Sequence, residues 1–73
     1  MVYKFAALIE REDGWYVAVC PELDVASQGK TLDEALANLR EAVQLYLESA
    51  DPTEWHLPEQ PPLLTTLDVA VNA

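Results

Sequence analysis

One stretch of the sequence, residues 31–50, has the spacing of an amphipathic helix, and it limits what the rest of the chain can form. Its apolar residues recur every three or four positions and form one stripe. They are Leu32, Ala35, Leu36, Leu39, Val43, Tyr46 and Leu47. Thr31 precedes the stripe and Glu34 follows three residues later, which is the capping-box pattern. We predict a helix that begins after Thr31 and ends near residues 49–50, before Pro52.

The residues before this helix have the alternation of β-strands. Val2–Glu10 is predicted as a first strand, followed by a turn at Arg11–Gly14. The side chains expected on one face of this strand are Tyr3, Phe5, Ala7 and Ile9. Trp15–Cys20 is rich in aromatic and β-branched residues and is predicted as the returning strand, which Pro21 ends. Val25–Gln28 is predicted as a short third strand.

The residues after the helix divide into a connector and a further strand. Residues 51–62 contain four of the five prolines, which indicates an irregular connector. Leu63–Val71 alternates again and is predicted as a fourth strand. The order β-β-β-α-β predicts one α+β domain over residues 1–73. It is a two-layer sandwich in which a single helix covers a mostly antiparallel sheet, because the helical stripe is the only apolar surface available.

The length of the chain leaves room for a small core only. A domain of 73 residues has a net stability of about 3–5 kcal/mol and usually needs additional support. Cys20 is the only cysteine, so no disulfide forms within the chain, and with His56 it is too few for a zinc site. Self-association remains, and we therefore expect a homodimer or a larger homo-oligomer.

The charge balance excludes one class of partner and leaves two interpretations of the acidity. The chain has 4 cations and 13 acids, a net charge of -9, and no cluster of Lys or Arg that would bind phosphates. We expect no direct binding of nucleic acid. The acids either maintain solubility or attract a basic partner. The sequence has no signal peptide and no apolar run of about 20 residues, so we expect a cytoplasmic protein that spans no membrane.

No arrangement of residues indicates catalysis, a metal or a cofactor. Cys20 and His56 are the only possible nucleophile–base pair, and they occupy an apolar strand and the proline-rich connector. Gly14 and Gly29 lie in separate turns and form no phosphate-binding loop. The enzymatic alternative is a degenerate metal-dependent nuclease, whose acids would be Glu10 and Asp68.

Several short segments together resemble the HicB-like antitoxin family. They are Glu12-Asp13-Gly14-Trp15-Tyr16-Val17, Cys20-Pro21-Glu22-Leu23, Ser27-Gln28-Gly29-Lys30-Thr31-Leu32-Asp33-Glu34-Ala35 and Glu41-Ala42-Val43-Gln44-Leu45-Tyr46-Leu47-Glu48. The resemblance covers about residues 3–49. It implies a reduced ribonuclease H-like fold without the catalytic acids.

The resemblance also implies a function. Members of that family bind HicA, a small basic ribonuclease toxin, and block its action. Many carry a C-terminal DNA-binding domain, whereas this sequence matches only their N-terminal domain and lacks their usual Pro-Gly-Cys-type turn after Pro21-Glu22-Leu23. We therefore expect a protein-binding domain that neutralises such a toxin without binding an operator. The alternative is a stand-alone homo-oligomeric domain with another partner or ligand.

Four residues are the candidates for contacting a protein partner. Affinity in an interface depends on a few apolar anchors near its centre, where aromatic side chains are favoured. Trp15 and Tyr16 follow the predicted hairpin turn, Leu45 lies off the apolar stripe of the helix, and Trp55 lies in the connector. Each of them has the alternative role of ordinary packing.

Overall fold

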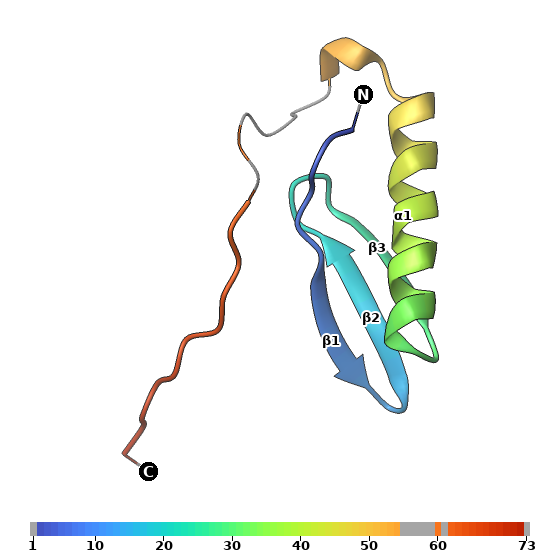
Figure 1. The fold of residues 1–73 in the computed structure, drawn as a ribbon. Coiled ribbons are helices and arrows are strands. Elements are labelled where there is room, and N and C mark those ends of the chain that lie inside the picture. The colour runs from blue at the N-terminus through green and yellow to red at the C-terminus, as the bar shows by residue number, and fades with distance from the viewer. Residues whose placement is uncertain (1, 55–59, 61, 73) are drawn as a thin grey trace.

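The structure, a computed structural model, describes residues 2–54, 60 and 62–72. Three antiparallel strands precede one long helix, and the helix packs against the sheet (Figure 1). The elements are β1 (Leu8–Glu12), β2 (Trp15–Cys20), β3 (Val25–Gly29), α1 (Leu32–Ser49) and a 3-10 turn at Pro52–Glu54. The predicted α+β fold, a sheet covered by one helix, is confirmed.

The β1–β2 hairpin turns within two residues. Asp13 and Gly14 both have positive φ, 48° and 81°, which is the backbone of a tight primed turn that matches the twist of the strands. Pairing therefore continues up to Glu12 and Trp15, which are directly opposite each other. The prediction of a four-residue turn at Arg11–Gly14 was wrong, because this geometry leaves Arg11 and Glu12 in the strand.

The first strand begins at Leu8, and the prediction that it begins at Val2 was wrong. In the segment before β1, a backbone N–H binds a side chain in place of another strand. The Ala6 N–H donates to the two carboxylate oxygens of Glu22, at 2.9 and 3.2 Å. The regular alternation breaks at the same point. Phe5 and Ile9, which were predicted to share a face, both pack against the core, but Ala7 of the same predicted face is exposed and Ala6 is buried.

The helix has the predicted N-terminus. Thr31 is the N-cap, and its Oγ1 accepts a hydrogen bond from the Glu34 N–H at 3.1 Å. At the same end α1 lies very close to β3, since a Cβ added to Gly29 would be 2.5 Å from the Ala35 nitrogen. The Asn38 side-chain amide donates to the carbonyl of Gln28 at 2.8 Å, which also attaches α1 to β3.

The core is small and lies between α1 and the two strands β2 and β3. Its fully buried members are Ala18, Cys20, Ala35 and Leu39. Leu39 is a central residue as predicted, and Leu36 is half-buried. The predicted stripe is too long, because Leu32 and Tyr46 are 44% and 40% exposed near the two ends of α1. The helix is longer than the sheet face that it covers, as Figure 1 shows.

The fourth strand predicted at Leu63–Val71 is absent from this single chain. Residues 62–72 are extended but pair with no strand among the described residues, and the segment runs away from the helix and sheet (Figure 1). Alternation gives a segment two distinct sides, but a strand also needs a neighbouring backbone for its hydrogen bonds. Among the described residues the order is therefore β-β-β-α, and the expected homo-oligomer stays a prediction.

Candidate protein-binding face

The sheet has one face packed against α1 and one face without a helix. Side chains of a strand alternate between faces, and residues paired across strands share a face. Tyr16, Ala18 and Cys20 of β2 belong to the helix side, because all three are part of the core. The register then assigns eight residues to the other side, which we call the open face. They are Leu8, Glu10, Glu12, Trp15, Val17, Val19, Ala26 and Gln28.

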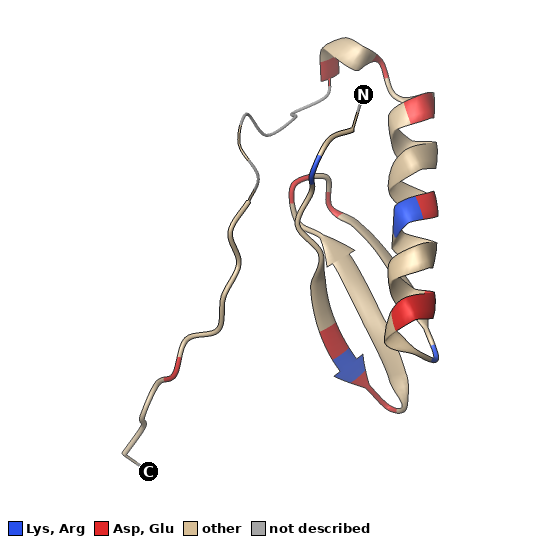
Figure 2. Ribbon diagram, in the orientation of Figure 1, with Lys and Arg blue, Asp and Glu red and all other residues tan. Residues whose placement is uncertain are grey.

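The open face has an apolar centre and an acidic margin. Trp15, Val17 and Val19 follow one another along β2, the middle strand, and Leu8 lies beside Val19 on β1. Leu8 is 46% and Trp15 37% exposed, so both side chains are available for contact. Glu10 and Glu12 lie beside this centre on β1, and Figure 2 shows the acids of that strand. An apolar centre with a polar rim is the usual composition of a protein–protein interface.

Two cations lie against aromatic rings near the hairpin end of the sheet. The Lys30 ammonium is 5.1 Å from the centroid of the Trp15 ring, and the Arg11 guanidinium carbon is 5.1 Å from that of Tyr16. Both distances allow cation–π attraction, which limits the orientations of the two rings. The Lys30 ammonium therefore lies against the Trp15 ring at one end of the apolar centre.

The candidate contact residues predicted from sequence do not form one surface. Trp15 lies on the open face, whereas Tyr16 points to the helix side and packs against the core. Leu45 is 58% exposed on α1, which is the other layer of the domain. Trp55 lies outside the described residues. Val17 and Val19 of the open face were missed, although their alternation with Ala18 and Cys20 in the sequence was the signal that could have indicated them.

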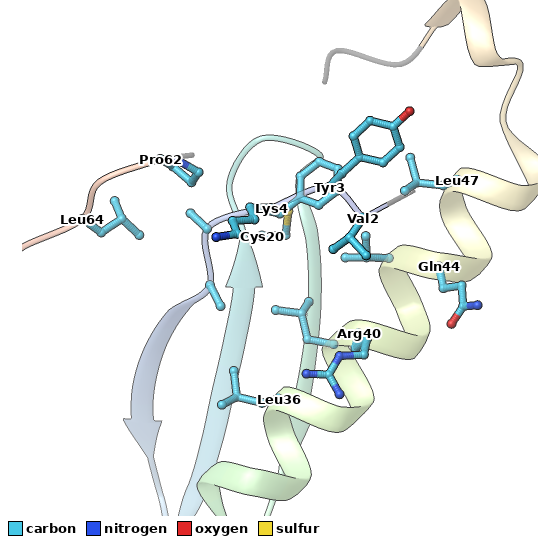
Figure 3. Close-up of a pocket in the computed structure, with 15 residues that line it drawn as sticks. Val2, Tyr3, Lys4, Cys20, Leu36, Arg40, Gln44, Leu47, Pro62 and Leu64 are labelled. Atoms are coloured by element: carbon cyan, nitrogen blue, oxygen red, sulfur yellow. The ribbon is translucent and has the colours of Figure 1, made fainter. Parts of the chain in front are cut away.

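A groove of about 870 Å³ lies between the N-terminal segment and α1. Figure 3 shows Val2 and Tyr3 beside the helix, whereas the Lys4 side chain points away from it, and Pro62 and Leu64 lie beyond the N-terminal segment. The helix contributes Leu36, Leu39, Arg40, Val43, Gln44 and Leu47. The helix wall of this groove includes Leu36, Val43 and Leu47 of the predicted stripe, which the sheet covers only in part.

Cys20 lines the inner end of this groove but is fully buried. Burial raises the pKa of its thiol, because the thiolate would lose its hydration, and the nearby Glu22 carboxylate adds to the effect. The thiol therefore stays protonated near neutral pH, in the form that is a weak nucleophile and a weak metal ligand.

The described residues contain no group of three or more His, Cys, Asp or Glu side chains that could hold a metal ion. Glu10 belongs to β1 and Asp68 to the C-terminal segment, and they are not part of any such group there. His56 lies outside the described residues. Among the helices of the described residues, none has the length and apolar content that crossing a bilayer requires.

The fold and the open face together define a small α+β domain whose helix-free sheet surface can contact another molecule. A family described as "Family of unknown function (DUF7387)" matches residues 5–70. The UPF0150 protein ssr1765 of Synechocystis sp. is 38% identical over 72 residues, covering 96% of this chain and 91% of that protein. The chain therefore belongs to the DUF7387 family, and it is similar over nearly its whole length to a UPF0150 protein.

Relatives occur in distant organisms. A UPF0150 protein of Archaeoglobus fulgidus is 49% identical over 47 residues, which is 62% of this chain and 68% of that protein. One from Helicobacter pylori is 43% identical over 49 residues, which is 66% of this chain and 68% of that protein. No solved structure matches this chain.

Proposed function

We propose that this protein acts by binding, as a HicB-type antitoxin domain in the cytoplasm, and that its partner is a small basic HicA-type ribonuclease toxin. The observation that carries the proposal is the open face, where an apolar centre along β2 lies beside Glu10 and Glu12. A ribonuclease must attract phosphates, so its own surface is basic and complements these acids. The resemblance of residues 3–49 to HicB-like antitoxins supports the same partner.

The physical basis of such a complex is divided between charge and apolar contact. The net charge of -9 speeds the encounter with a basic protein, and this effect weakens as the Debye length falls from about 10 Å at 0.1 M salt to about 3 Å at 1 M. Most of the affinity comes from a few anchors at the centre of the interface. Trp15 is the aromatic residue of the open face and is 37% exposed, so it is the anchor that we propose.

The test uses the purified full chain and a HicA-type ribonuclease encoded beside it. Replacing Trp15 with Ala should weaken binding by roughly 30-fold, the loss typical of an interface hot spot. Leu45→Ala is the matched control, because it also removes an exposed apolar side chain but lies on α1. Calorimetric titration gives both affinities, and cleavage of RNA by the toxin shows whether binding inhibits it.

Each outcome of this test has a definite meaning. If Leu45→Ala abolishes binding and Trp15→Ala has no effect, the interface lies on the helix and the open face is excluded. If the two folded wild-type proteins do not associate at all, the antitoxin proposal fails. The protein is then a stand-alone domain with another partner, which is the second candidate function and is favoured by the exposed apolar C-terminal segment.

A further inference from the structure

The C-terminal segment has one side of bare apolar surface. Four of its residues occupy alternate or next-alternate positions and therefore share a side of the extended chain. They are Leu63, Leu67, Val69 and Val71, which we call the tail stripe, and they are 92%, 84%, 71% and 80% exposed. Thr65 interrupts the stripe between Leu63 and Leu67, but an exposed apolar strip of this length usually marks an interaction site. Residues 63–71 carry only one charge, Asp68, so charge does not protect the strip.

A second unpaired feature is the outer edge of β1. The strand order is β1-β2-β3, so β1 and β3 are both edge strands, and β1 pairs with no strand of the described residues on its outer side. The edge of β3 is already in contact with α1, where the Asn38 side chain donates to the carbonyl of Gln28. The outward N–H and C=O groups of β1 can therefore pair with an added strand. Residues 63–71, which we call the tail, also pair with no strand of the described residues. The tail and the β1 edge can therefore form backbone hydrogen bonds with each other.

The position of the first residues of the tail bears on whether it pairs with β1 of its own chain or with β1 of another copy. Pro62 and Leu64 line the groove beside the N-terminal segment, and Leu64 is partly covered there, at 53% exposed (Figure 3). Beyond this point the tail extends away from its own sheet (Figure 1), so its own β1 leaves the tail stripe uncovered. We propose that residues 63–71 of one copy add as a strand to the outer edge of β1 in a second copy, and that the exchange is reciprocal.

The area available is sufficient for such a dimer. Burying one Leu or Val removes roughly 60–120 Å² from water, so two tail stripes bury roughly 500–1,000 Å² of side chain. Backbone pairing adds to this and brings the total near the roughly 1,200–2,000 Å² of stable interfaces. Reciprocal exchange of one segment is an established route to two-fold dimers. Each copy has a net charge of -9, so salt should strengthen this association, whereas it should weaken binding to a basic partner.

Sedimentation equilibrium of the full chain tests the proposal at tens of micromolar. The wild-type protein should have twice the monomer mass of 8.1 kDa. Replacing both Leu67 and Val69 with Lys should weaken the dimer at least roughly 100-fold, because two charges would enter the apolar contact in each copy. The matched control is Thr66→Lys, which adds a charge on the opposite side of the tail and should leave the dimer intact. Circular dichroism should show the same helix content in all three proteins.

Energy transfer between two differently labelled copies identifies the strand that the tail reaches. A donor at Asn72→Cys in one copy and an acceptor at Glu12→Cys in the other should report transfer at dimer concentrations, while buried Cys20 stays unlabelled. A wild-type protein that remains at 8.1 kDa overturns the proposal, whether the tail folds onto its own sheet or binds another partner. A dimer indifferent to the Leu67 and Val69 substitutions, or one without transfer between copies, overturns it as well.

Discussion

Residues 15–20 and residues 63–71 are both predicted as strands from the sequence, but they differ in structure. β2 has a neighbouring strand on each side and a helix over one face, so Ala18 and Cys20 are completely buried. Residues 63–71 pair with no strand in the part of the chain that the structure describes, and Leu63 is 92% exposed. Alternation therefore specifies which side chains share a side, while the neighbours available to the backbone decide whether a strand forms.

The largest expected effect on stability comes from a substitution in the core that β2 forms with α1 and that residues 63–71 do not share. Leu39→Ala should cost about 2–5 kcal/mol of the free energy of unfolding, because Leu39 is only 4% exposed at the centre of the core. This loss approaches the total stability of a domain of this size, so the domain should be largely unfolded. Urea denaturation followed by circular dichroism measures it, with Leu45→Ala as the exposed control. An unchanged midpoint would mean that α1 docks through another face.

A smaller effect should come from the contact between the two layers. An added Cβ at Gly29 would lie 2.5 Å from the Ala35 backbone nitrogen, so Gly29→Ala must push α1 away from β3. We expect a loss of about 1–3 kcal/mol in the free energy of unfolding. Gly14→Ala is the comparison, since no atom lies within 4 Å and only the positive φ of 81° opposes it, at about 1 kcal/mol. A smaller loss at Gly29 than at Gly14 would contradict this close approach.

The smallest effect should come from removing the tail. Truncation after Pro62 should change the free energy of unfolding by less than about 0.5 kcal/mol when the protein concentration is below the dissociation constant of the dimer. The reason is that residues 63–71 bury little of their apolar surface in the single chain. Thermal unfolding in dilute solution measures this. A large loss of stability would show that the tail packs on its own domain, and the contrast with β2 would disappear.

Local chemical signals in the sequence were sufficient for most of the fold. Thr31 and Glu34 marked the start of the helix, and Asp13-Gly14 marked the hairpin, because caps and tight turns depend on neighbouring residues only. The start of β1 was not predictable in this way. It is determined by Glu22, which is sixteen residues from Ala6 and takes its backbone donor. Formation of a strand by residues 63–71 likewise requires a second backbone, which their own sequence does not specify.

The candidate site was predictable in part. Trp15 was named from its residue type and its place beside the turn, and it lies on the open face as an exposed aromatic residue. Tyr16 was named for the same reason but belongs to the opposite face, since adjacent residues of a strand point in opposite directions. The open face also depends on the strand register, which places Leu8 opposite Val19 and Glu12 opposite Trp15. This grouping follows from the pairing of two strands and cannot be predicted from either strand alone.

The buried position of Cys20 makes this protein its own folding sensor. It is the only thiol in the chain, and it is fully buried in the core. A thiol reagent can therefore modify the protein only after the structure around Cys20 opens. A brief pulse of such a reagent, followed by mass spectrometry, would count the opened molecules directly, with no engineered cysteine.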